Sequence, residues 1–256
     1  MLFVRRFLRP SGFVSLACLM AWSVPPLTQA AVEPRPTALY ATSENPSESA
    51  ARLVDRGLER YRVGDYPQAI ALWEDALEFP LTAEDTAIVL GNLAAASQQL
   101  GRLQEAVFRW EQALEIVRSQ PDAEEQIAQI LTEQSQAYDA MGQHQRAIRL
   151  LQEALTLAET TGDRATQVAI HGGLGNAYWS LGRYEDAIDA HETSLDLARP
   201  LGLDVFVTTA LNNLGTVAQD MGQLEEALAC YRRALTIREK ELAPNHPDLA
   251  LSLNNL

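Results

Sequence analysis

Apolar residues recur along most of the chain at the three- and four-residue spacing of amphipathic helices. The stretch from Leu174 to Leu195 contains two such segments with a glycine between them. Runs of strictly alternating apolar and polar residues, which would indicate β-strands, do not extend beyond a few positions. We therefore predict an all-α chain of short helices joined by tight turns. Helices are expected at 45–63, 67–79, 87–100, 126–141, 165–181 and 205–221.

The unit of two helices and a turn recurs five times. Measured between the turn glycines, the repeat is 37 to 41 residues long. A period in this range is typical of solenoids, in which stacked units bury one continuous core. Glycine suits the positive φ that ends one helix and reverses the chain. The turn glycines are Gly64, Gly101, Gly142, Gly182 and Gly222.

Positions at fixed distances from the turn glycine keep their size in all five units. Seven residues before it the side chain is small: Gly57, Ala94, Ser135, Gly175 and Gly215. Nine residues after it the side chain is large: Trp73, Trp110, Leu151, His191 and Tyr231. Five residues after it stands alanine: Ala69, Ala106, Ala147, Ala187 and Ala227. Small residues let two helix backbones approach and large ones fill the space beside them, so these columns predict tightly packed helix pairs.

Residues that cap helix N-termini stand at the joints between units. Asn45, Thr82 and Asp163 each precede a predicted helix, as capping residues do. Asp122 and Glu125 have the spacing of a capping box, in which each side chain bonds the other's backbone amide. We expect all four helices to start at these residues.

His171, Leu174, Gly175, Tyr178, Ala187 and His191 together resemble the tetratricopeptide repeat (TPR), with histidines where that family favours Trp and Phe. The resemblance covers about residues 47–256, and the long repeats are similar to those of kinesin light chains and bacterial signalling TPR proteins. It implies a right-handed superhelical solenoid of antiparallel helix pairs. The first helix of each pair would line a concave groove.

The array is expected to occupy residues 45–256, with five full repeats and the start of a sixth. Leu211-Asn212-Asn213-Leu214 recurs as Leu253-Asn254-Asn255-Leu256, which would end the chain inside the first helix of that sixth unit. We therefore expect a fragment, or a truncated gene product, of a longer protein. Exported arrays of this kind resemble the N-terminal halves of proteins that end in a caspase-like CHAT domain.

Residues 1–30 have the anatomy of a secretory signal peptide. Three arginines precede a short apolar stretch, and small residues surround the expected cleavage site after Ala30. An uncleaved anchor and lipidation at Cys18 are the alternatives. Residues 31–44 contain two prolines and no helical period, so we expect a flexible linker. The mature protein is expected in the periplasm or outside the cell, and N-terminal sequencing would decide.

The charge restricts the class of partner. The chain has 34 acidic residues against 20 basic ones, for a formal net charge of −14. Phosphate binding needs Lys and Arg, so nucleic acid is not expected as a partner, nor is anionic lipid beyond the export signal. The acidity serves solubility or attracts basic peptides.

Motifs of nucleophilic, nucleotide-dependent or metal-dependent catalysis do not occur, so we predict neither enzyme activity, nor a cofactor, nor a metal site. His171 and His191 occupy two columns expected to meet across a helix pair. They would form a pH switch or half of a metal site, or they simply fill aromatic positions. We favour packing, because a third ligand is not evident. Cys230 is expected to be a packed thiol.

Polar side chains at inward positions of the first helices form the candidate binding surface. They are Asn92, Gln98, Gln136, Asn176, Trp179, Asn212, Asn213 and Thr216, continued by Asn254 and Asn255. Asparagine can hold both an N–H and a C=O group of an extended peptide, and Trp179 offers a flat apolar platform. The alternative is that asparagine only solvates the helix face. Because Lys and Arg are missing from these positions, a neutral or basic ligand is expected.

Two functions follow from the resemblance. The first is a non-catalytic scaffold that binds peptides or proteins in the concave groove. The second is a regulatory or sensor arm of a larger effector, whose CHAT domain would lie beyond residue 256. The gene sequence past that residue separates the two.

Overall fold

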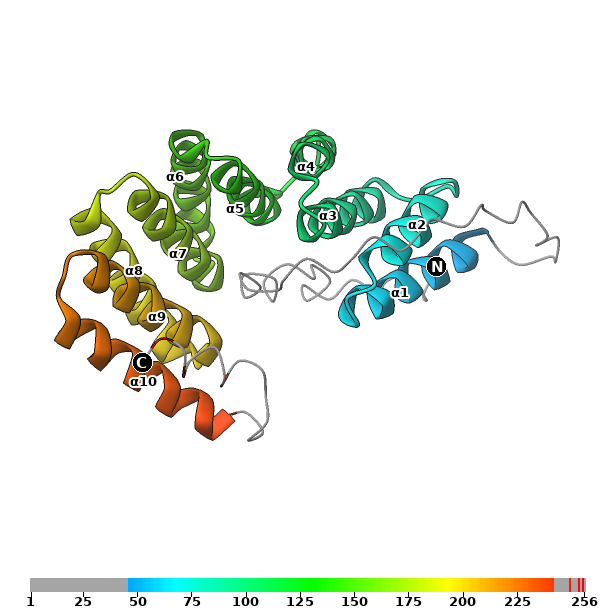
Figure 1. Ribbon diagram of the computed structural model, residues 1–256. Helices are drawn as coiled ribbons and strands as arrows, with labels where there is room; N and C mark the ends of the chain where they lie inside the picture. Colours follow the sequence, from blue (N-terminus) through cyan, green and yellow to red (C-terminus); the bar gives the residue numbers. More distant parts are fainter. Residues whose placement is uncertain (1–45, 242–248, 250–252, 254, 256) are drawn as a thin grey trace.

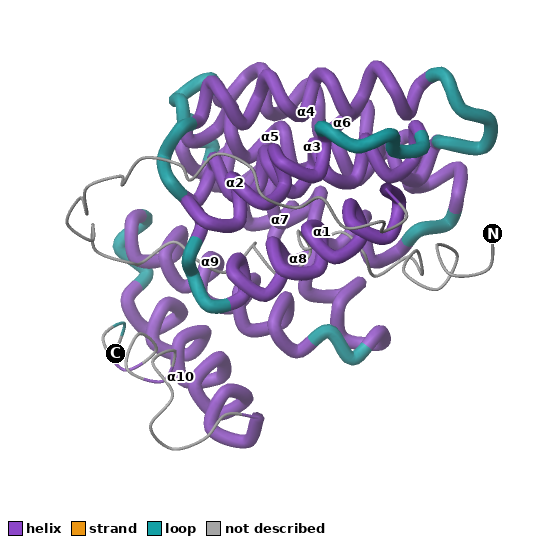
Figure 2. The backbone as a smooth tube through the Cα atoms, turned by 90° about the vertical axis from the view of Figure 1, so that its right-hand side faces the viewer, coloured by secondary structure: helices purple, strands orange, loops and turns teal. Residues whose placement is uncertain are grey.

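The computed structural model describes residues 46–241 together with residues 249, 253 and 255. All regular secondary structure in these residues is helical (Figure 2). Within residues 46–241, ten α-helices and one short 3-10 helix, η3, follow one another. They are α1 (Pro46–Arg62), α2 (Tyr66–Leu77), α3 (Ala83–Gln99), α4 (Leu103–Arg118), α5 (Glu124–Ala140), α6 (His144–Thr161), α7 (Arg164–Ser180), α8 (Tyr184–Ala198), η3 (Arg199–Leu201), α9 (Asp204–Asp220) and α10 (Leu224–Glu241).

Consecutive helices pack as antiparallel pairs, α1 with α2 through α9 with α10, and the pairs stack into an arc (Figure 1). The odd-numbered helices lie on the inner side of the arc and the even-numbered helices on the outer side. Inner helices of neighbouring repeats also contact one another, as α5 contacts α7 and α7 contacts α9. The all-α array of helix pairs is therefore confirmed, and its first helices form the concave face.

The five turn glycines end the first helix of each pair in the left-handed conformation. Their φ angles lie between 70° and 79°. At the fourth turn, Gly182 has φ 70° and the amide of Arg183 donates to the carbonyl of Tyr178 at 2.9 Å. This bond satisfies a carbonyl that the end of a helix would otherwise leave unpaired. The predicted role of the glycines is confirmed.

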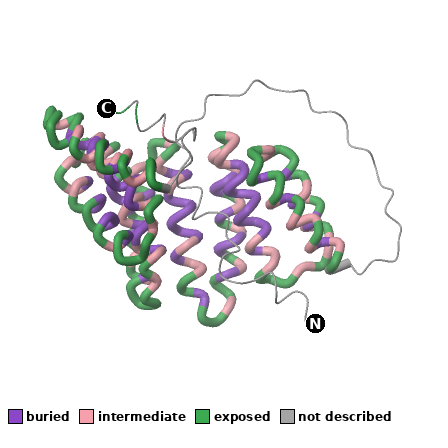
Figure 3. The backbone as a smooth tube through the Cα atoms, turned by 90° about the horizontal axis from the view of Figure 1, so that it is seen from below, coloured by how far each residue is buried: buried purple, intermediate pink, exposed green. Residues whose placement is uncertain are grey.

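The small and large columns meet inside the first, fourth and fifth pairs, where the small residue is glycine. A Cβ atom on Gly57 would overlap the indole of Trp73, and one on Gly215 would lie 2.5 Å from the ring of Tyr231. The five alanines after the turns are also buried, with 0 to 4% of their surface exposed. Figure 3 shows the buried residues gathered along the faces where helices meet, with exposed residues on the outer surface.

Two of the predicted caps are confirmed and one is wrong. The side chain of Thr82 accepts from the amide of Asp85 at 3.1 Å, and that of Asp163 accepts from the amide of Thr166 at 3.1 Å. Asp122 instead adopts a left-handed φ of 55°, and the helix begins after Ala123 without a side-chain cap. The aspartate is used to turn the chain between repeats, a conformation that Asp tolerates better than most residues.

Several predictions lie outside the described residues. These are the signal peptide at 1–30, the linker at 31–44 and the cap at Asn45. Most of the sixth repeat, including Asn254, also lies outside them. Of the helices that the structure describes, none combines the length and apolar character needed to cross a membrane.

Candidate functional site

Two side-chain hydrogen bonds join the inner helices of the fourth and fifth repeats. The Nδ2 amide of Asn213 on α9 donates to Oδ1 of Asn176 on α7 at 3.0 Å. The indole Nε1 of Trp179 donates to Oδ2 of Asp220 at 2.7 Å. We call Asn176 with Asn213 the amide pair, and Trp179 with Asp220 the indole–carboxylate pair. Both bridges connect α7 to α9, on the concave side of the arc.

The amide pair keeps hydrogen-bonding capacity for a ligand. Asn176 is exposed and Asn213 half-buried. Their mutual bond uses one donor and one acceptor, so the Nδ2 amide of Asn176 and Oδ1 of Asn213 remain. One donor beside one acceptor matches the C=O and N–H groups of an extended peptide backbone. The sequence pattern proposed that an asparagine side chain holds both groups, whereas here the free donor and acceptor belong to two residues on different helices.

Two further candidates on α9, Thr216 and Asn212, lie partly buried in the fold. The hydroxyl of Thr216 donates to the carbonyl of Asn212 at 3.1 Å and lies 3.3 Å from the hydroxyl of Tyr231. Thr216 therefore faces its own helix pair. Asn212 is half-buried, and its Oδ1 is buried without a hydrogen-bond partner.

The candidates on α3 and α5 do not form comparable pairs. Asn92 is only 2% exposed, and its Nδ2 has no hydrogen-bond partner. Gln98 and Gln136 are half-buried, and the Nε2 amide of Gln136 is also buried without a partner. The structure thus gathers Asn176, Trp179 and Asn213 into one place and leaves the remaining candidates separate.

The two histidines differ in environment. His191 is 1% exposed and packs against Gly175, one turn after His171 on α7. Burial lowers the pKa of His191 to about 4. Burial also lowers the pKa of the half-buried His171, against an opposing effect from the Glu159 carboxylate. In the part of the chain that the structure describes, three or more His, Cys, Asp or Glu side chains are nowhere close enough to share a metal ion.

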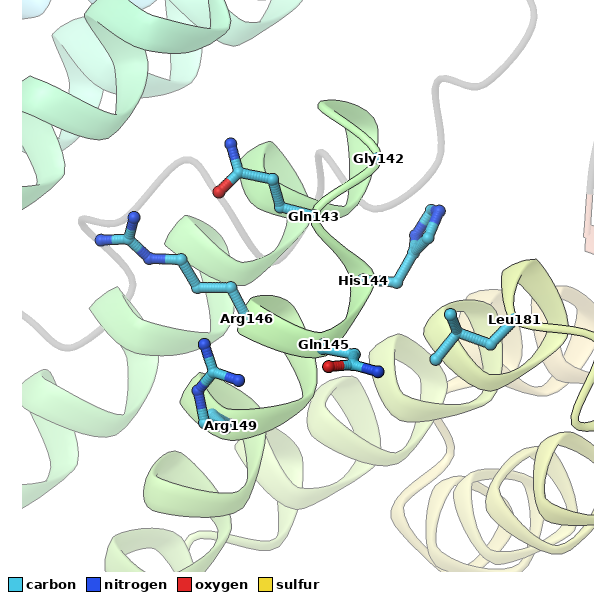
Figure 4. Close-up of a pocket in the computed structure, with 7 residues that line it drawn as sticks. All are labelled: Gly142, Gln143, His144, Gln145, Arg146, Arg149 and Leu181. Atoms are coloured by element: carbon cyan, nitrogen blue, oxygen red, sulfur yellow. The ribbon is translucent and has the colours of Figure 1, made fainter.

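An open pocket of about 340 Å³ lies at the start of α6 (Figure 4). The guanidinium of Arg146 in its wall lies 4.0 Å from the ring of Tyr138 and 3.8 Å from the carboxylate of Glu111. His144 contacts Asp139 at 2.7 Å. These polar groups are engaged within the fold, so the pocket is not our candidate site. It is lined by Gly142, Gln143, His144, Gln145, Arg146, Arg149 and Leu181.

The sequence matches the model of the tetratricopeptide repeat family over residues 85–160, 126–200 and 206–256. These segments cover more than half of the chain. Comparison with characterised protein sequences finds no match.

Several solved structures share the fold. The structure of BtubC (BKLC) from P. vanneervenii matches with a TM-score of 0.61 and 22% identity, over 78% of this chain and 92% of that one. The TPR-like repeats of a putative kinesin light chain from Podosopora anserina match with a TM-score of 0.59 and 21% identity, over 78% and 99%. A Rap protein complexed with competence and sporulation factor matches with a TM-score of 0.69 and 18% identity, over 76% and 56%. At these identities the likeness extends to the fold alone.

Proposed function

Because the chain belongs to the tetratricopeptide repeat family, whose members typically mediate protein–protein interactions, we propose that it is a non-catalytic interaction module. It binds an extended segment of a partner protein on the concave face between α7 and α9. The observation that carries this proposal is the amide pair, in which Asn176 and Asn213 bridge two repeats and still offer a donor and an acceptor.

Charge favours a neutral or basic ligand. The formal net charge of the chain is −14, and Asp220 stands beside Trp179 on the same face as the amide pair. A carboxylate-rich segment would be repelled there, because like charges at close range raise the free energy of the complex. The Rap match supports the general mode, since that structure was solved with a bound factor.

Site-directed photo-crosslinking in the producing cell tests the proposal. A benzophenone amino acid replaces Ser180 on α7, one helical turn after Asn176, or Phe108 on the outer helix α4 as the control, so the amide pair stays intact. Ser180 and Phe108 are both exposed. We expect one crosslinked partner from position 180 that is missing from position 108. Crosslinks that are equal at both positions, or confined to 108, would contradict the proposal.

We further propose that the module works after export, in the periplasm or outside the cell. The support is the sequence of residues 1–30, with arginines followed by an apolar stretch and small residues before Ala30. N-terminal sequencing of the protein from the exported fraction should begin at Ala31. Protein found only in the cytoplasm, with Met1 retained, would contradict export.

A further inference from the structure

The indole–carboxylate pair has chemistry that the amide pair lacks. The hydrogen bond from Nε1 of Trp179 occupies Oδ2 of Asp220 at 2.7 Å and leaves Oδ1 of that carboxylate. Trp179 is half-buried and Asp220 exposed, so the pair borders solvent. The bond holds an anionic oxygen at the edge of an aromatic ring. An ionised carboxylate with an oxygen to spare accepts further donors.

An aromatic ring beside a carboxylate is suited to one kind of side chain. A cation is attracted to the face of an indole, and arginine adds planar stacking and a fork of donors that fits a carboxylate. Among the described residues, no basic side chain forms an ion pair with Asp220. Arg183, in the turn after α7, is held by Asp186 at 2.7 Å and lies 4.4 Å from the ring of Tyr178. It is therefore engaged away from this carboxylate.

We infer that the indole–carboxylate pair is a subsite for one basic side chain, arginine in preference to lysine, of a peptide whose backbone is held by the amide pair. This inference rests on the proposed function and names the ligand's chemistry. Trp179 follows Asn176 by one helical turn, and Asp220 follows Asn213 by two. At 1.5 Å per residue, the two pairs lie roughly 5–10 Å apart along the groove. An extended peptide covers that distance in about two residues.

A peptide titration followed by NMR tests the inference on the full chain labelled with ¹⁵N. The probes are two pools of acetylated, amidated heptapeptides, with arginine or its neutral isostere citrulline at the centre and uncharged residues elsewhere. The reporter is the indole signal of Trp179, assigned by its loss in Trp179→Phe. The substitution distinguishes it from the signals of Trp22, Trp73 and Trp110, the other tryptophans of the chain. We expect the arginine pool to bind about fivefold more tightly than the citrulline pool.

The variant Asp220→Asn supplies the control, because asparagine keeps an acceptor for the indole and loses the charge. In this variant the preference for the arginine pool should shrink, because the carboxylate charge is lost and only the attraction of the indole face for a cation remains. If the wild-type protein binds both pools equally, or if the Trp179 signal does not move, the subsite is wrong. Movement of the Asn176 and Asn213 side-chain signals with both pools would then leave the proposed groove standing. If no signal moves with either pool, the proposed function fails as well.

Discussion

The imidazole of His191 lies directly against the backbone of Gly175, so that a Cβ atom at that glycine would overlap three atoms of the ring. The same relationship joins Gly57 to Trp73 and Gly215 to Tyr231. Glycine in a helix interior lowers helix stability by about 1 kcal/mol relative to alanine. These positions accept that cost because only a missing side chain lets the partner ring pack against the helix.

Gly175→Ala should destabilise the protein, although it improves helix propensity. Overpacking in a core costs about 1–3 kcal/mol, which exceeds the gain of about 1 kcal/mol. Gly172→Ala is the matched control on the same helix. A Cβ there would lie 3.7 Å from the hydroxyl of Ser194, an ordinary contact, so this variant should be as stable as wild type or more so. Urea unfolding measures both, and equal stabilities would contradict the packing account.

His191 should make the protein less stable in mild acid. Its pKa is about 4 in the folded protein and about 6.5 when unfolded, so the unfolded chain binds more protons between these values. The stability contributed by the neutral ring is complete above about pH 6.5 and declines as the pH falls toward 4. The loss should reach about 2 kcal/mol at pH 5.

His191→Phe provides the comparison for this pH dependence. An aromatic ring fits the position, since Trp73 and Tyr231 occupy its equivalents over Gly57 and Gly215. The variant should lose less stability between pH 7.5 and pH 5 than wild type does. If the free energies of unfolding of the two proteins changed in parallel with pH, protonation of His191 would not destabilise the fold, and the prediction would be wrong.

Gly182→Ala isolates the backbone requirement of a turn. A Cβ at this residue would meet nothing within 4 Å, so only the φ of 70° opposes a side chain. Left-handed backbone costs an alanine about 1–2 kcal/mol, while asparagine tolerates it better. Thermal unfolding should therefore rank wild type above Gly182→Asn and Gly182→Asn above Gly182→Ala. An alanine variant as stable as wild type would contradict this reading of the turn.

Much of the fold could be predicted because the same pattern of small and large positions occurs in all five repeats, so each repeat supports the helix assignment of the others. The small column before the glycine and the large column after it meet as expected, at Gly175 and His191 for example. The predicted helix over 165–181 begins and ends one residue earlier in the structure, at Arg164–Ser180. The failure at Asp122 was local, because a residue with a capping side chain is equally suited to a left-handed turn.

The site was less predictable, because it depends on how one repeat is rotated against the next. Asn176 and Asn213 are 37 residues apart, and Trp179 and Asp220 are 41 apart. Periodicity relates equivalent positions, whereas these partners occupy different columns of their repeats. Asp220 was missed for this reason. The signal available in the sequence was that each pair of partners is separated by about one repeat length, 37 and 41 residues.

The affinity of the crosslinked partner for variants of the amide pair tests the central claim most directly. Isothermal titration calorimetry would compare three proteins: the wild type, the double variant Asn176→Ala/Asn213→Ala, and the control Gln152→Ala. Gln152 is an exposed amide on the outer helix α6. Losing two backbone hydrogen bonds of about 1 kcal/mol each should weaken binding roughly tenfold or more, while the control binds as wild type does. Unchanged affinity in the double variant would contradict a peptide held between α7 and α9.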